Sequence, residues 1–390
     1  MKQNLSMVAL WVLVVAGNGA LIFGQSVSRE KPAVKGGGAT LPAPLYQIAI
    51  ADFEERHPNG KMQILYNQQV PFHTPRPFGS EEGIRLVRGN GLDFAGTDWP
   101  LTEDELRRYR LVQFPMAVGG IAIIYNLPEI TKPEIDTFHP LDTPTAEVIH
   151  LRPETIARIF QGSITRWNDA LIRRDNPTLK TPLPSVEIIP VYRLDGSGTT
   201  YILTNFFSAG GGSWAGGSGF TVKKWAPGGI AAAGSEAMAD TVAHTRYSIG
   251  YAENDYAQRQ GVVAAELLVK MSDAVKPVAA ENSTFGAALS KDAVGRWAKG
   301  ELTDSALQAL FPKTENTPSA PRGQSDPYPI SGVTWVLVKQ NLDPASRDEL
   351  CEFLKFLPGW LDTNASTYNY APLPANAREV TEQRIKAICK

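Results

Sequence analysis

Apolar and polar positions alternate in a way that predicts short strands and amphipathic helices along most of the chain. Within residues 44–56, Leu45, Ile48, Ala49 and Phe53 recur at helical spacing, and the apolar residues 62–66 that follow predict a strand. Further helices are predicted at 81–88, 103–109, 153–160, 199–207, 347–357 and 379–388, and further strands at 92–95, 117–125, 186–192 and 333–338. The run 117–125 is long and apolar enough for a fully buried or crossover strand. This alternation predicts an α/β fold with mainly parallel sheets.

The first 28 residues have the pattern of a secretory signal peptide. Lys2 precedes an apolar run over residues 7–16, and a second short apolar run follows the Gly-Asn-Gly sequence at 17–19. A retained membrane anchor is the alternative, but the interruption leaves no unbroken span of about 20 apolar residues. We therefore expect export, with cleavage near Gly24 or Ser28.

Composition narrows the class of protein further. The chain has 390 residues, which suggests two or three domains, and 43% hydrophobic content is typical of a globular protein. The 38 basic residues against 40 acidic ones give a net charge of −2, so bulk binding of nucleic acid is excluded. Cys351 and Cys389 are too few for a disulfide scaffold, although an exported compartment permits them to form one disulfide.

Three short polar segments precede or follow predicted elements. Residues 36–42 form a glycine-rich entry to the first helix, and Ser80 stands at the expected N-cap of the next. Asp98 closes an acidic segment, residues 93–98, after a predicted strand, where carboxylates face ligand crevices in α/β proteins. Taken singly, each segment also has a plain structural reading as a turn or a helix cap.

The fourth segment, residues 192–200, is the most specific. Between a strand and a helix it offers the guanidinium of Arg193, the carboxylate of Asp195 to hold it, and the hydroxyls of Ser197 and Thr199. Consecutive backbone N–H groups at a helix start add to these, and one oxyanion could accept hydrogen bonds from all of them. An ordinary N-cap with a surface ion pair is the alternative reading.

Ser197 could instead be the nucleophile of a secreted phosphoesterase. That chemistry needs a histidine base and a Gly-x-Ser-x-Gly elbow, but Asp195 replaces the first glycine. The histidines form no metal-ligand spacing and are expected to be surface or capping residues: His57, His73, His139, His150 and His244. The sequence therefore favours binding over catalysis, with no catalytic residue, cofactor or metal expected.

Together these segments resemble the phosphate-binding component of bacterial ABC phosphate importers. The matching strings are GGGATLPAPLYQ, FGSEEGIRLVRGNGLDFAGTDWPL, LVQFPMAVGGIAIIYN, RIFQGSITRWND, VYRLDGSGTT and YSIGYAENDYA. They occur in family order from Gly36 onward, and the opening string is also similar to the DING subgroup. The resemblance implies a two-lobed periplasmic-binding-protein fold, class II-like, whose hinge strands lie near 117–125 and 333–338. Residues 29–118 and 330–390 would form lobe I, and residues 119–329 lobe II.

The resemblance also implies a set of phosphate-binding residues. Thr40 would donate through its hydroxyl and Leu41 through its backbone N–H, Asp98 would accept a proton from phosphate, and Asp195 would orient the cationic Arg193. The full implied set is Thr40, Leu41, Ser80, Asp98, Arg193, Ser197, Gly198 and Thr199, with Asp195 behind them.

Two features depart from the family pattern. Glu81 and Glu82 replace small residues in the first turn after Ser80, and would weaken anion binding if either pointed inward. The preceding segment, residues 67–78, is longer than in relatives and carries three prolines, so we expect it to reshape the mouth of the cleft.

The family resemblance further implies a place and a set of partners. We expect a periplasmic monomer that binds inorganic phosphate, with arsenate as a competitor. It would deliver the ligand to the membrane permease and ATPase components of an ABC importer. A surface or signalling protein with a vestigial phosphate site is the remaining alternative.

Overall fold

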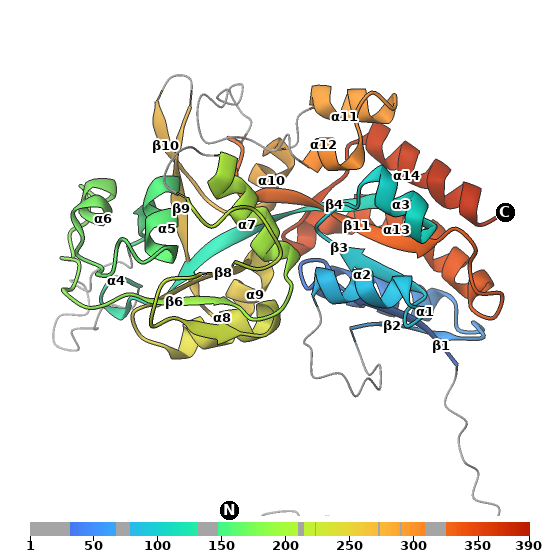
Figure 1. Ribbon diagram of the computed structural model, residues 1–390, viewed down its shortest axis with the longest axis horizontal. Coiled ribbons are helices and arrows are strands. Elements are labelled where there is room, and N and C mark those ends of the chain that lie inside the picture. The colour runs from blue at the N-terminus through green and yellow to red at the C-terminus, as the bar shows by residue number, and fades with distance from the viewer. Residues whose placement is uncertain are drawn as a thin grey trace, which may run out of the picture. The chain divides into compact units, whose positions relative to one another are not determined.

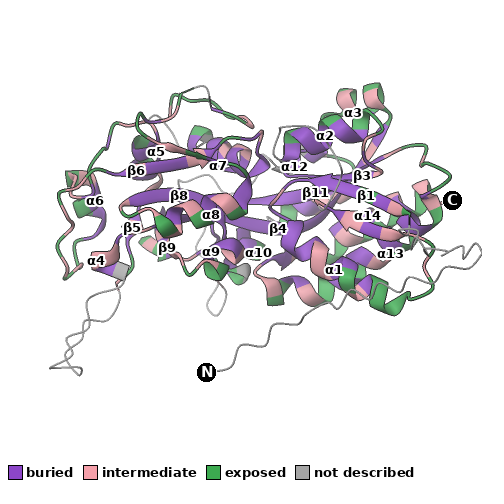
Figure 2. Ribbon diagram, turned by 90° about the horizontal axis from the view of Figure 1, so that it is seen from below, coloured by how far each residue is buried: buried purple, intermediate pink, exposed green. Residues whose placement is uncertain are grey.

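A long central strand, β4 (Leu111–Tyr125), links two groups of strands in the computed structural model of the chain (Figure 1). Residues Leu111 to Gly120 of β4 pair with β11 (Ser331–Lys339), whereas Ile121 to Tyr125 pair with β8 (Ser248–Glu253). Fourteen of the fifteen residues of β4 are buried, Val112 being the exception (Figure 2). The prediction of a buried crossover strand is confirmed, although it began six residues too late.

The structure describes residues 32–67, 79–131, 147–209, 214–222, 224–271, 274–288, 291–308 and 325–390. The proposed signal peptide and most of the segment 67–78 lie outside these residues, as do His73 and His139. From Pro32 to Lys390 the described residues belong to one compact unit. None of the described helices is long and apolar enough to cross a membrane.

The first group of strands is arranged in the order β2, β1, β3, β11. Strand β1 (Ala33–Gly38) runs parallel to both β2 (Gln63–Tyr66) and β3 (Phe94–Thr97), and β11 is antiparallel to β3. The helices of this half are α1 (Ala43–Arg56), α2 (Ser80–Arg88), α3 (Glu103–Tyr109), α13 (Arg347–Asn364) and α14 (Ala375–Ile388).

The second group continues from β4 through β8 and β6 (Ile189–Arg193) to β7 (Ile230–Ala232), and these last three strands are mutually parallel. Strand β9 (Val263–Lys270) pairs with β4, with β5 (His150–Leu151) and with β10 (Val275–Val278). The main helices here are α5 (Pro153–Phe160), α6 (Ala170–Asp175), α7 (Gly198–Ala209), α8 (Gly234–His244) and α9 (Asn254–Arg259). Shorter helices are α4 (Pro128–Thr131), α10 (Asn282–Ala288), α11 (Lys291–Ala298) and α12 (Asp304–Gln308).

The prediction of mainly parallel sheets is wrong. Parallel pairs occupy the flanks, but β4 and β11 run antiparallel to each other and to their other neighbours through the middle of the sheet. Alternation of strands and helices predicts parallel neighbours only when each strand pairs with the next one along the chain. Here β11 comes from the far end of the chain and inserts between β3 and β4.

The glycine-rich opening also differs from its prediction as a turn. Gly36 and Gly37 belong to β1 and pair with Phe94 and Ala95 of β3. A Cβ atom on Gly36 would lie 2.1 Å from the ring of Phe94, so only glycine lets this buried ring cross the strand. Gly38, with φ of 128°, then turns the chain toward α1.

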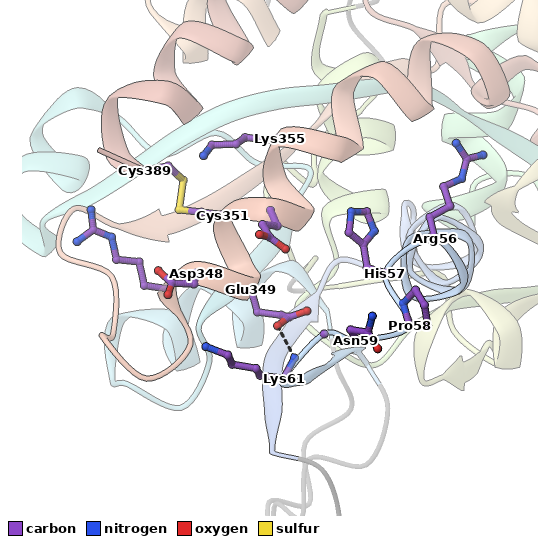
Figure 3. A pocket seen from close by; sticks show the side chains of 13 residues that line it. Arg56, His57, Pro58, Asn59, Lys61, Asp348, Glu349, Cys351, Lys355 and Cys389 are labelled. Atoms are coloured by element: carbon purple, nitrogen blue, oxygen red, sulfur yellow. Dashed lines mark hydrogen bonds between the residues drawn. A yellow bond between two sulfur atoms is a disulfide. The ribbon is translucent and has the colours of Figure 1, made fainter.

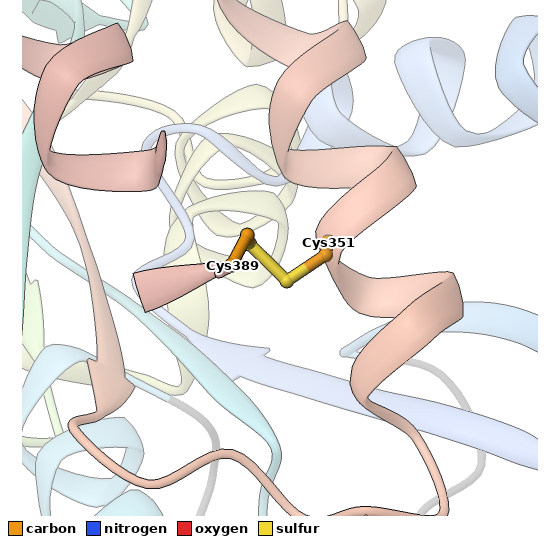
Figure 4. Close-up of a disulfide and its surroundings, with 2 residues drawn as sticks. All are labelled: Cys351 and Cys389. Carbon is orange, nitrogen blue, oxygen red and sulfur yellow. A yellow bond between two sulfur atoms is a disulfide. The ribbon is translucent and has the colours of Figure 1, made fainter. Parts of the chain in front are cut away.

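Cys351 of α13 and Cys389, which directly follows α14, form a disulfide (Figure 4). Their Cα atoms are 5.7 Å apart, and 38 positions separate them in the sequence. The covalent bond therefore holds the C-terminal helix against α13, as the composition permitted.

Candidate functional site

The functional side chains come from the carboxyl ends of parallel strands. Thr40 follows β1, and Asp98 follows its parallel neighbour β3. Arg193 ends β6, next to which β8 ends at Glu253 and β7 is followed by Ser235. Parallel strands present their carboxyl ends at one edge of a sheet, where ligands bind in open α/β folds.

Arg193 is the centre of the hydrogen-bond network and is only 4% exposed. Its Nε donates to Asp195 Oδ1 at 2.7 Å, and Nη2 donates to the other carboxylate oxygen. Its Nη1 donates to Ser235 Oγ at 3.0 Å and to Thr199 Oγ1 at 3.3 Å. Burial acts to lower the pKa of Arg193, but the Asp195 carboxylate together with the charge of Glu253 acts in the opposite direction, and the pKa is raised. The two hydrogen bonds to Asp195 hold the guanidinium in one orientation.

Ser235 links this network to the other half of the site. Its hydroxyl lies 2.8 Å from Thr40 Oγ1, and the Thr40 carbonyl accepts a hydrogen bond from the Tyr256 hydroxyl at 3.1 Å. Leu41, next along the chain, is buried, and its carbonyl accepts from Tyr370. Ser235 was not among the predicted site residues, although a Gly-Ser pair at the start of a helix is a usable signal.

Ser80 and Asp98 form a second hydrogen-bonded pair near the Arg193 network. Ser80 is the first residue of α2 rather than its N-cap, which is Gly79. The Ser80 hydroxyl donates to Asp98 Oδ2 at 3.4 Å and accepts from the Asp98 backbone N–H at 3.2 Å. Gly198, at the start of α7, packs directly on both, because a Cβ atom there would lie 2.3 Å from Ser80 Oγ and 2.4 Å from Asp98 Oδ2. The starts of α2 and α7 thus meet at Asp98.

Asp98 is a fully buried carboxyl group in an unusual electrostatic setting. Burial raises its pKa to about 7, with the nearby charge of Glu253 as the next contribution, and the neighbouring Thr334 hydroxyl, Arg193 and Ser80 oppose the shift. Its Oδ1 atom has no hydrogen-bond partner among the described residues. A carboxyl group of this kind can share a proton with a ligand near neutral pH.

Glu253 is a second buried carboxylate that the sequence analysis missed. It is 2% exposed, and its Oε1 accepts a hydrogen bond from Thr199 Oγ1 at 2.7 Å. It lies in the string YSIGYAENDYA and ends a strand, as the residue before Asp98 does. The strand-end rule that selected Asp98 could therefore have selected Glu253 too.

Ser197 is fully buried, and its Oγ accepts the backbone N–H of Thr200 at 3.1 Å, which makes it a helix-start hydroxyl. The histidines within the described part of the chain make other contacts. His57 bonds the Phe53 carbonyl, His150 lies 3.1 Å from Glu266, and His244 pairs with Asp240. Nothing in the described residues supplies Ser197 with a histidine base.

The two extra acids of α2 make no described contact with Arg193, although Glu81 lies beside the loop that follows Arg193. Glu82 is buried, but both of its oxygens are held by Arg85, at 2.7 and 2.5 Å. Glu81 is exposed, and its backbone N–H donates to the Gly196 carbonyl at 3.1 Å. Its carboxylate lies against Gly196, where an added Cβ atom would meet it at 2.0 Å. Neither acid contacts Arg193 in the described hydrogen bonds and ion pairs.

A separate surface hollow of about 580 Å³ lies beside the disulfide (Figure 3). It mixes basic side chains such as Arg56 and Lys355 with acidic ones such as Asp348. Glu349 faces it, but its carboxylate is already committed to the backbone N–H of Lys61 at 3.0 Å. No residue of the Arg193 network is among those that line this hollow. The Arg193 network, with its buried and oriented guanidinium, is therefore the stronger candidate for the functional site.

Comparison with known proteins agrees with this fold. A family model described as a PBP superfamily domain matches residues 24–358. The chain is 31% identical over 346 residues to the phosphate-binding protein PstS of Xylella fastidiosa, covering 88% of this chain and 82% of that one. It is 28% identical to PstS of Haemophilus influenzae over 95% of this chain and 96% of the relative. The chain belongs to the PBP superfamily and, within it, to the PstS family.

Solved structures show the same fold at lower identity. A high affinity periplasmic phosphate-binding protein, PfluDING, solved with phosphate, superposes with a TM-score of 0.63 at 19% identity, covering 90% of this chain and 93% of that one. A DING protein gives 0.61, also at 19% identity and with the same coverage. The two-lobed α/β binding-protein fold is therefore confirmed.

Proposed function

We propose that this chain is an exported solute-binding protein that captures inorganic phosphate between its two lobes and delivers it to an ABC importer. The observation that carries the proposal is that the start of α7, beside the buried and hydrogen-bonded Arg193, packs directly on the Ser80–Asp98 pair at the start of α2. The names of its PstS relatives support the same ligand. The lobes are proposed to divide within β4, between residues 118 and 119, and again between 329 and 330.

The proposed ligands are the residues that the resemblance implied. Hydroxyl and backbone donors after β1, at the start of α2 and after β6 would surround the anion with Arg193: Thr40, Leu41 through its N–H, Ser80, Ser197, Gly198 and Thr199. At about 1.5–3 kcal/mol per charge-assisted hydrogen bond, the gross gain exceeds the roughly 8 kcal/mol that corresponds to micromolar affinity. Asp98 would accept the proton that phosphate retains at neutral pH.

Binding rather than catalysis is the activity this geometry supports. A phosphoesterase would need a histidine or another base beside the Ser197 hydroxyl. The described hydrogen bond of this hydroxyl is with the backbone N–H of Thr200 at the start of α7, which it accepts. We further propose a periplasmic monomer that also binds arsenate, because arsenate retains a proton as phosphate does.

Calorimetric titration of the purified chain with phosphate tests the proposal. We expect one site per chain and a rise in melting temperature, because a ligand that binds only the folded state stabilises it. Arg246→Ala, which removes an exposed guanidinium paired with Glu129, should bind as the wild type does, whereas Arg193→Ala should not. Absence of heat and of thermal stabilisation at millimolar phosphate would refute phosphate binding. Turnover of a phosphate ester that Ser197→Ala abolishes would establish the esterase instead.

A further inference from the structure

Three half-buried aromatic side chains meet near the start of α7, and they come from separate parts of the chain. The ring centroid of Trp99 lies 4.4 Å from that of Tyr201 and 4.4 Å from that of Phe220, with interplanar angles of 35° and 30°. Trp99 follows β3, Tyr201 lies on α7, and Phe220 lies in the segment 214–222. We call these three residues the aromatic clasp.

Two members of the clasp belong to one hydrogen-bonded unit. The Phe220 carbonyl accepts the backbone N–H of Ser197 at 3.1 Å, just before α7 begins. One turn beyond Tyr201, the Thr204 hydroxyl accepts the backbone N–H of Gly219 at 3.1 Å. Because both bonds tie the segment to α7, Tyr201 and Phe220 move together with the start of that helix.

The third member is fixed to the segment that carries Asp98. The backbone N–H of Trp99 donates to Thr97 Oγ1 at 3.1 Å, and the same hydroxyl donates to the Trp99 carbonyl at 2.9 Å. These bonds hold the residues on both sides of Asp98, so the position of the indole and that of the carboxyl group are coupled. Phe220 also packs against an apolar cluster formed by residues of α2, α3 and β11. The clasp therefore joins the two groups of elements that meet where Asp98 touches the start of α7.

We propose that Trp99 is a positioning residue for phosphate binding, which acts through the clasp to hold Asp98 against the start of α7. The inference rests on the phosphate-binding function and on the two lobes proposed above. When the lobes separate to release the ligand, Trp99 must leave both rings, because it moves with β3 while they move with α7. The clasp therefore lengthens the time for which phosphate stays bound, although none of its rings is a proposed ligand.

The rate at which bound phosphate is released tests this directly. The wild type and Trp99→Ala are loaded with radiolabelled phosphate, and the loss of bound label after addition of excess unlabelled phosphate gives the release rate. Because Trp99→Ala removes two aromatic contacts, its release should be at least about tenfold faster. The association rate, calculated from the release rate and the calorimetric Kd, should stay within about threefold of wild type, since phosphate enters before the clasp forms.

Matched variants separate the clasp from general stability. Trp99→Phe keeps a ring in place and should recover most of the slow release, and Phe220→Ala should speed release without a change at Trp99 itself. The double alanine variant should release no faster than Trp99→Ala, because Trp99 is the shared partner of both contacts. Tyr368→Ala is the control: this half-buried ring, just before β12 (Ala371–Pro372), stacks on Trp360 at 6.1 Å, and its loss should leave the release rate unchanged.

The contrary outcomes can be told apart. Wild-type release rates in both Trp99→Ala and Phe220→Ala would overturn the inference. It would also be wrong if Trp99→Phe released as fast as Trp99→Ala, or if Tyr368→Ala sped release by the same factor, because release would then follow general stability rather than the clasp. If the wild type retains no label even at millimolar phosphate, the proposed function itself is refuted.

Discussion

Replacing Asp98 by Asn should stabilise the ligand-free protein at neutral and alkaline pH. Asp98 is fully buried, and its pKa is raised from 3.8 to about 7 by burial and then by the charge of Glu253. The folded state therefore accommodates the ionised form poorly. Asparagine has nearly the same shape and no charge to bury.

The magnitude follows from the two pKa values. Between pH 3.8 and about 7 the unfolded chain has lost this proton while the folded chain retains it, so the free energy of unfolding falls as pH rises through this window. A difference of about 3 pH units at 1.36 kcal/mol each amounts to about 4 kcal/mol, fully developed above pH 7. Loss of the hydrogen bond from the Ser80 hydroxyl to Asp98 Oδ2 offsets about 1 kcal/mol. The variant should thus be about 3 kcal/mol more stable than wild type at about pH 8.

Urea unfolding of the phosphate-free proteins at about pH 4 and pH 8 measures both values. Asp104→Asn is the control, because the Asp104 side chain is 91% exposed and its removal should give no comparable pH dependence. The reasoning fails if the stability difference between Asp98→Asn and wild type is the same at both pH values. It also fails if the variant is the less stable protein at pH 8.

Three further predictions concern binding and covalent structure. Arg193→Ala should weaken phosphate binding by about 3 kcal/mol, which calorimetry would record as a loss of affinity of more than a hundredfold. Arg193→Lys should recover only part of the lost affinity, because lysine lacks the planar guanidinium fork. Near-native affinity of Arg193→Ala would place the anion elsewhere. The wild type should prefer phosphate and arsenate to sulfate, because sulfate has no proton to share with Asp98. Asp98→Asn should lose this preference, because an amide can donate a hydrogen bond to sulfate. If both proteins show the same phosphate-to-sulfate affinity ratio in competition against labelled phosphate, the prediction is wrong. Replacing Cys351 and Cys389 by Ser should lower the free energy of unfolding by about 4 kcal/mol, because the disulfide closes a loop of 38 residues in the unfolded chain. Phosphate affinity should not change. An unaltered stability in urea unfolding would contradict the prediction.

Features specified by neighbouring residues could be predicted from the sequence. The helix predicted at 103–109 matches α3 residue for residue, because Thr102 and Glu105 form a capping box at its start. The helix at 153–160 matches α5, which begins at a proline suited to that position. Arg193 and Asp195 are two positions apart, so the ion pair that orients the guanidinium is itself a local feature. The sequence of this segment alone therefore predicted the pairing of the guanidinium with the carboxylate that orients it.

Tertiary structure alone decided what depends on distant residues. Strand β11 joins the sheet from near the C-terminus, which makes the central pairs antiparallel. Ser235 joins Thr40 to Arg193 across nearly two hundred positions of sequence, and no local pattern encodes that contact. The raised pKa of Asp98 requires full burial and the nearby Glu253, two conditions that exist only after strands from both halves of the chain meet. A sequence motif specifies which chemical groups are available. How deeply each group is buried, and which charges lie near it, depends on packing between segments that meet only when the chain folds.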